Sequence, residues 1–197
     1  ELNGTPFITM QPQAAVRDMI FWYPEQSAEA IVPYPVTVQM GYPNYFGNSF
    51  CTLQNINFIN SYRGFKAGPI MGGAHLLDRI YGSPLYNGID VDGIADTGRV
   101  QFVDFSPDYW ADSGLPGSPQ RNGAHKTYIY ENATGILLRR DDWSYTTYSS
   151  VEGYKKGLSL EESDCTDAYV NGEKVNHYFH NGPTYYITVK NCQYGIY

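Results

Sequence analysis

Hydrophobic and polar residues alternate with a period of two along four stretches of the chain. The clearest is 98–105, where Val100, Phe102, Val103 and Phe105 are interspersed with charged and amide residues. Residues 36–40, 50–60 and 184–190 show similar patterns. Such alternation is typical of a strand with one buried face. These four stretches are therefore predicted to be β-strands.

Two other stretches have a helical spacing of apolar residues. In 12–23, the apolar side chains Val16, Met19, Ile20 and Tyr23 fall at i, i+3, i+4 and i+7. This spacing places them on one face of a helix, and Pro12 suits a first helical turn. In 74–81, the residues Leu76, Leu77 and Ile80 would form the buried side of a short helix. The pattern predicts one N-terminal helix and a second short one.

Turn signals are frequent in the C-terminal half. Asn132-Ala133-Thr134-Gly135 separates two strand-like runs, 126–131 and 135–140, and Asn171-Gly172 is a strong two-residue hairpin signal. Asn181-Gly182-Pro183 is a further turn, so 165–197 is expected to form a hairpin-rich antiparallel meander. Three prolines in 106–122 indicate one long loop there.

The fold class expected from these elements is mainly β. The arrangement predicted is an antiparallel sandwich or open curved sheet, with a short N-terminal helix and long loops rich in Gly, Pro and Tyr. The 197 residues include 19 Tyr, 20 Gly and 12 Pro, which favours strands separated by many turns. The length fits a single globular domain over 1–197, with 1–11 as an extended arm.

Charge and hydropathy exclude two classes of partner. The net charge is −7, from 20 acidic and 13 basic residues, and the basic residues form no stripe. Binding of nucleic acid through phosphate contacts is therefore not expected. No apolar run approaches the ~18 residues needed for a membrane-spanning helix, so no membrane span is expected.

Three features favour a secreted or cell-surface protein. The charged fraction is only 17%, and the sequons at Asn3 and Asn132 are potential glycosylation sites. The third feature is that Cys165 and Cys192 bracket the predicted meander, so a disulfide bond between them is expected, with Cys51 left over. The alternative is three buried thiols. The start at Glu1, without methionine, fits either a mature secreted product or a truncated chain.

The spacing of aspartates and glycines in the segment 87–96 resembles that in calcium-binding loops. Asp90, Asp92 and Asp96 offer carboxylates at alternate or near-alternate positions. Calcium prefers such oxygen ligands, so calcium is the predicted cofactor, with these three residues as ligands. The closing glutamate of an EF-hand is missing, since Gln101 stands at the twelfth position. The alternative is a polar loop with Asx-turns.

The sequence contains no motif for nucleophilic catalysis or zinc binding. There is no Gly-x-Ser-x-Gly elbow. His177 and His180 are three residues apart, so in a strand their side chains would point to opposite faces. No catalytic residue is therefore assigned.

Aromatic residues in predicted loops are the best candidates for a binding surface. They have amide and carboxylate neighbours, which suits sugar recognition through ring stacking and hydrogen bonds. The candidates are Tyr42, Tyr45, Tyr109 and Trp110, with the neighbours Asn44, Asn48, Asp108 and Asp112. The alternative is that these rings fix their own loops to the sheet.

The function expected from the sequence is a non-catalytic extracellular binding or assembly module, with a glycan or a neighbouring subunit as partner. One alternative is a carrier that holds an apolar ligand in a curved sheet. The other is a secreted hydrolase acting on glycans.

Overall fold

The computed structural model describes residues 4–41 and 50–197, and it consists mainly of two parallel β-sheets. Sheet A contains β1 (Ile8–Met10), β3 (Val36–Met40), β5 (Arg63–Ala67), β7 (Asn87–Val91), β9 (Thr134–Leu138), β11 (Lys156–Leu160) and β15 (Tyr194–Ile196). Sheet B contains β2 (Ala15–Phe21), β4 (Cys51–Phe58), β6 (His75–Gly82), β8 (Arg99–Phe105), β10 (Tyr145–Glu152) and β14 (Thr184–Lys190).

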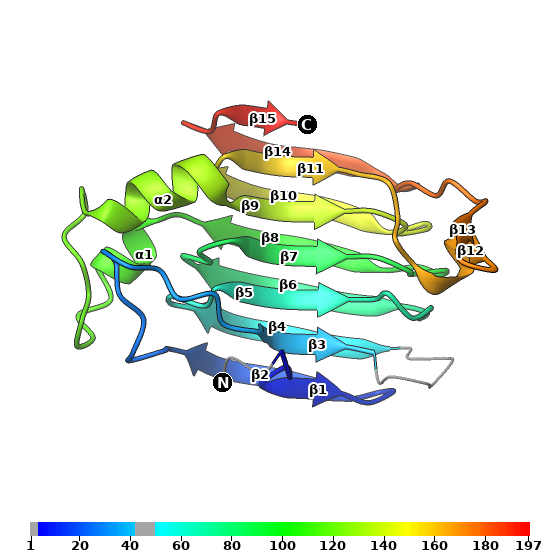
Figure 1. Ribbon diagram of the computed structural model, residues 1–197, viewed down its shortest axis with the longest axis horizontal. Coiled ribbons are helices and arrows are strands. Elements are labelled where there is room, and N and C mark those ends of the chain that lie inside the picture. Colours follow the sequence, from blue (N-terminus) through cyan, green and yellow to red (C-terminus); the bar gives the residue numbers. More distant parts are fainter. Residues whose placement is uncertain (1–3, 42–49) are drawn as a thin grey trace.

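The chain winds as a solenoid, because successive strands of these two sheets alternate between them. Each coil runs along sheet A in one direction and returns along sheet B in the other (Figure 1). The next coil stacks on it, so every strand pairs in parallel with strands of the neighbouring coils. The helices α1 (Asp108–Ala111) and α2 (Ala124–Asn132) lie at one end of the strands, between β8 and β9 (Figure 1).

The expected antiparallel sandwich is wrong. The two large sheets are parallel throughout, and the antiparallel pairing found is the small hairpin β12 (Tyr169–Val170) and β13 (Glu173–Lys174). Alternating burial has the same period in parallel and antiparallel strands, so the local pattern did not distinguish them. The hairpin itself confirms the Asn171-Gly172 signal, because both residues have the positive φ values, 51° and 83°, that a type I′ turn requires. The rest of the predicted C-terminal meander is replaced by the 3₁₀ turn Thr166–Ala168 and the parallel strands β14 and β15.

Both helices expected from the apolar spacing are strands instead. Residues 15–21 form β2 and 75–82 form β6. The reason is one residue in each strand with a left-handed backbone, Asp18 (φ 55°) and Arg79 (φ 55°). Such a residue lengthens the spacing between two inward-facing side chains from two positions to three, as between Leu77 and Ile80. A spacing of three is also typical of one face of a helix.

The same left-handed position recurs in every strand of sheet B. It bends each strand: in β4, Cys51 and Leu53 are buried before Asn55 (φ 53°), and Ile56 and Phe58 after it. The six residues align in register as one outward column: Asp18, Asn55, Arg79, Phe102, Tyr148 and Tyr186. Their side chains interact along the column, since Asn55 donates to Asp18 at 2.7 Å and the last three rings stack at 5.4 and 4.9 Å. These contacts offset the cost of left-handed backbone in residues other than glycine.

The space between the sheets is filled by stacked apolar side chains. Leu53, Leu77 and Val100 are in register on sheet B and fully buried. Five glycines of sheet A are in register and face sheet B: Gly64, Gly88, Gly135, Gly157 and Gly195. At the first four, the sheets approach closely against large side chains of sheet B. A Cβ atom on Gly88 would stand 2.4 Å from the Phe105 ring, and one on Gly135 would stand 2.5 Å from Val151. The solenoid interior is therefore a packed core.

The hairpin predicted around Asn132 is also replaced. Residues 124–132 form helix α2, and the strand β9 begins directly after it. His125 and Ile129, four residues apart, are the buried residues of the helix. The strands predicted at 36–40, 50–60, 98–105 and 184–190 are confirmed as β3, β4, β8 and β14. Among the described residues, no helix is long and apolar enough to cross a membrane.

Candidate functional site

A polar groove lies on the outer face of sheet A and has a volume of about 380 Å³. We call it the sheet A groove. Its lining comes mainly from the neighbouring strands β3, β5 and β7, with further residues from the segments before β1 and after β9. The lining residues are Gly4, Val36, Gln39, Arg63, Phe65, Lys66, Tyr86, Asn87, Asp90 and Arg139.

The parallel register explains why polar side chains gather there. Gln39, Lys66 and Asp90 are register partners on β3, β5 and β7. Arg63 and Asn87 are partners in a second row. Because neighbouring strands lie about 4.8 Å apart, each row presents one side chain per coil at that spacing. The groove therefore offers a regular array of hydrogen-bonding groups.

Asp90 is the buried ionisable group of the groove. Burial raises the pKa of its carboxyl group, while the nearby cations Arg139 and Lys66 act to lower it. Asp90 Oδ1 lies 3.8 Å from Arg139 Nε. Neither atom has a hydrogen-bond partner among the described residues. A buried, unsatisfied carboxylate oxygen facing a groove is an available acceptor for a ligand.

An aromatic pair borders the groove. The rings of Tyr62 and Tyr86 stack with centroids 5.1 Å apart and planes 7° from parallel. The Arg63 guanidinium lies 5.6 and 5.4 Å from these two centroids. Cation–π contacts of this kind orient the guanidinium before any ligand arrives.

The predicted calcium loop is not formed. Asp92 is buried, and its carboxylate accepts hydrogen bonds from the backbone N–H groups of Gly93 and Asp164 and from the Ser163 hydroxyl. Its oxygens are thus used in joining β7 to the segment after β11. Asp96 is exposed and accepts from the Thr97 N–H in a local turn. Within residues 4–41 and 50–197, no group of three His, Cys, Asp or Glu side chains is arranged to hold a metal ion.

Of the predicted aromatic surface, the structure describes Tyr109 and Trp110. Tyr109 lines a separate cavity of about 520 Å³ together with Asp108 and Asp112, and its hydroxyl donates to Asp104 at 2.7 Å. Trp110 is fully buried and packs edge-on against His125 at 5.5 Å. Tyr42 and Tyr45, with Asn44 and Asn48, lie outside the described residues.

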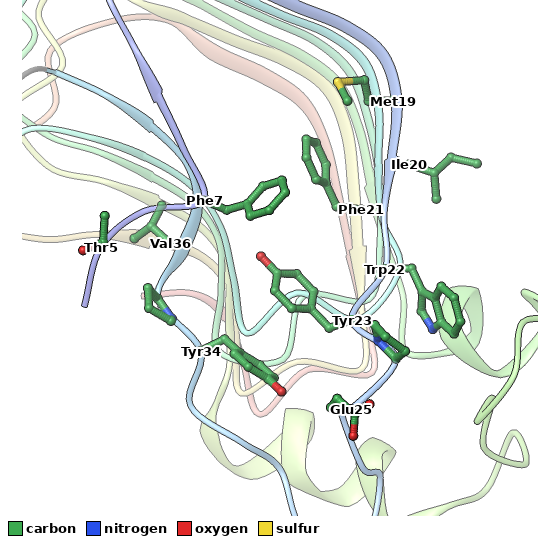
Figure 2. A pocket seen from close by; sticks show the side chains of 12 residues that line it. Thr5, Phe7, Met19, Ile20, Phe21, Trp22, Tyr23, Glu25, Tyr34 and Val36 are labelled. Carbon is green, nitrogen blue, oxygen red and sulfur yellow. The ribbon is translucent and has the colours of Figure 1, made fainter. Parts of the chain in front are cut away.

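An apolar cavity of about 530 Å³ lies at the end of the solenoid formed by β1 and β2. Figure 2 shows Phe7, Phe21 and Tyr23 pointing into the space between the sheets, while Ile20 and Trp22 point away from it. This cavity arises where the sheets end, because Met19 and Phe21 face inward without a preceding described coil to cover them.

The expected disulfide bond is absent: Cys51, Cys165 and Cys192 are all free thiols. Cys165 follows the end of β11, whereas Cys192 precedes the start of β15, which is parallel to β11. The two residues are therefore separated by the length of a strand. The Cys165 thiol donates to Asp167 at 2.8 Å, and the Cys192 thiol donates to the Lys190 carbonyl at 3.3 Å.

The two sequons fall in different situations. Asn132 is exposed at the end of α2, where its amide donates to the Tyr128 carbonyl at 2.9 Å. Asn3 lies outside the described residues. Nothing in the described part of the chain shows glycosylation or secretion.

A second polar cluster is enclosed where the strands of sheet B begin. The Ser144 hydroxyl donates to Asp141 Oδ1, and His180 Nδ1 lies 3.8 Å from Asp141 Oδ2. His75 is in register with Gly98 and Ser144, and its ring occupies the space left by the missing glycine side chain. Burial lowers the pKa of His75 to about 4 and raises that of Asp141 to about 7. Because these groups are buried, they do not form a substrate-accessible catalytic site.

Sequence reasoning identified Asp90 but missed Gln39, Arg63, Lys66 and Arg139 as its neighbours. They lie far apart along the chain and become adjacent only through the coil register. Comparisons of the chain with protein-family models, with curated proteins and with solved structures found no match.

Proposed function

We propose that this chain is a carbohydrate-binding module that holds a glycan in the sheet A groove. The observation that carries the proposal is the array of amide and charged side chains on β3, β5 and β7, bordered by Tyr86. Recognition sites for small polar ligands combine a few well-placed hydrogen-bonding groups with aromatic or apolar surface. The sheet A groove has both hydrogen-bonding groups and an aromatic surface.

The groove is built from repeating coils, so it suits a ligand that is itself built from repeating units. Register partners such as Lys66 and Asp90 present successive polar groups along the solenoid axis, whereas the Gln39 amide nitrogen already donates to the Gly68 carbonyl at 2.9 Å. An oligosaccharide offers hydroxyl groups at regular intervals along its length. The edge or face of Tyr86, held by stacking on Tyr62, offers an amphipathic surface for a sugar ring.

A glycan array followed by calorimetry with a soluble oligosaccharide that binds would test the proposal. Asn87→Ala should reduce affinity at least about tenfold, because it removes an amide from the groove. Asn122→Ala is the matched control, since Asn122 is an exposed amide outside the groove and has no left-handed backbone. Both variants should retain the parent melting temperature. The absence of any glycan ligand, or equal affinity in Asn87→Ala, would refute the proposal.

A second candidate function is a hydrolase that acts on glycans, and Asp90 favours it. A general acid needs a carboxyl group whose pKa is raised, and burial raises the pKa of Asp90. A hydrolysis screen on the bound glycan, with Asp90→Asn as the variant, separates the two functions. A hydrolase would cleave the glycan and lose turnover in Asp90→Asn, whereas a binding module would leave the glycan intact.

A further inference from the structure

Cations outnumber carboxylates in the lining of the sheet A groove, although the protein as a whole is acidic. The chain carries a net charge of −7, yet the groove is lined by Arg63, Lys66 and Arg139 against the single carboxylate of Asp90. Asp92 and Asp164, outside the lining, also lie within 4.0 Å of Arg139, so the unbalanced positive charge of the groove is that of Arg63 and Lys66.

The three cations differ in whether a nearby carboxylate already balances their charge. Arg139 lies between Asp90 and Asp164, at 3.8 and 2.9 Å, and its side chain is only 18% exposed. Arg63 and Lys66 form no ion pair with a carboxylate in the part of the chain that the structure describes. Arg63 instead contacts the tyrosine pair, which directs its guanidinium without neutralising its charge. These two side chains remain available to an anion.

We propose that the glycan bound in the sheet A groove is anionic, and that Arg63 and Lys66 contact its carboxylate or sulfate groups. This inference rests on the proposed carbohydrate-binding function and specifies its ligand class. Both cations line the groove from β5, its central strand. They are three residues apart, but Gly64 and Phe65 between them are both buried, so this strand does not alternate regularly there. Hydrogen bonds between ionised partners are stronger than neutral ones, and a guanidinium matches planar oxyanions.

An array carrying neutral, uronic-acid-containing and sulfated oligosaccharides tests the ligand class directly. Binding should be confined to anionic glycans and should weaken as salt is raised, because exposed charges are screened. The uronic-acid and sulfated arms show which anionic group is recognised. Equal binding of neutral glycans would overturn this inference while supporting the proposed function. Failure of every glycan on the array would refute both.

The double variant Arg63→Gln/Lys66→Gln tests the assigned residues. Its affinity for the anionic glycan should fall at least about tenfold and lose most of its salt dependence. The double variant Arg17→Gln/Lys190→Gln is the matched control, because it removes two exposed cations on sheet B and makes the same change in net charge. The control should stay within about twofold of the parent. Unchanged affinity in the groove variant, or an equal loss in the control, would refute the assignment.

Discussion

Asp90 Oδ1 lies 3.8 Å from Arg139 Nε, yet the two groups form no hydrogen bond there. Arg139 directs another nitrogen to Asp164 at 2.9 Å instead. The attraction between Asp90 and Arg139 therefore compensates only part of the cost of burying the Asp90 charge. This imbalance is consistent with the raised pKa of Asp90.

Asp90→Asn should stabilise the protein at neutral pH. Because the folded-state pKa of Asp90 is raised, its contribution to stability is greatest below its ordinary value of 3.8 and falls as the pH rises through the folded value. The asparagine side chain does not ionise, so the variant lacks this loss. Its melting temperature relative to that of the parent should therefore increase as the pH rises from 4 to 8. For a chain of this size, each kcal/mol corresponds to about 2–4 °C. A difference that does not change with pH would contradict this account.

His75 and Asp141 should have opposite effects on the pH dependence of stability. The pKa of His75 is lowered from 6.5 to about 4, so its contribution is full above pH 6.5 and is lost as the pH falls toward 4. The pKa of Asp141 is raised from 3.8 to about 7, so its contribution is full below pH 3.8 and is lost as the pH rises toward 7. Between about pH 4 and 6.5 the two effects cancel.

Single substitutions should reveal each effect. Relative to the parent, Asp141→Asn should gain stability as the pH rises from 4 to 7, and His75→Leu should gain as it falls from 6.5 to 4. Each slope should approach about 1.4 kcal/mol per pH unit. Denaturant unfolding at a series of pH values measures them, with the exposed Asp96→Asn as control. Slopes of the same sign in both variants would show that the two groups do not compensate.

Gly135→Ala should destabilise the fold by about 1–3 kcal/mol, because the new methyl group would overlap Val151. Gly195→Ala belongs to the same inward column, but its methyl group would lie 3.9 Å from Val189, an ordinary contact. It should cost less than about 1 kcal/mol. Chemical denaturation compares the two variants, and equal losses would mean that the close approach of the sheets is not the cause.

Trp110→Ala should reduce stability by about 3–5 kcal/mol, because it empties a fully buried site. It should leave the affinity for a glycan in the sheet A groove unchanged wherever the variant remains folded, since Trp110 does not line that groove. Urea unfolding and a binding isotherm at low temperature measure the two effects. A loss of affinity without a loss of stability would instead support the original prediction of an exposed anchor.

The sequence determined local features of this protein. Alternation over 98–105 predicted β8, and Asn171-Gly172 predicted the hairpin between β12 and β13, because both depend on residues within a few positions of each other. The net charge and the Tyr-, Gly- and Pro-rich composition indicated a β-rich chain without a basic stripe. Asp90 was also singled out, though for calcium.

Only the tertiary structure decided the direction of the strands and the composition of the site. Parallel pairing depends on how one coil stacks on the next, and side-chain alternation carries no information about it. The left-handed residues Asp18 and Arg79 lengthened the inward spacing from two to three, so two strands resembled helices. Lys66 and Asp90 became neighbours because β5 and β7 pair in register, although a whole strand of sheet B separates them along the chain.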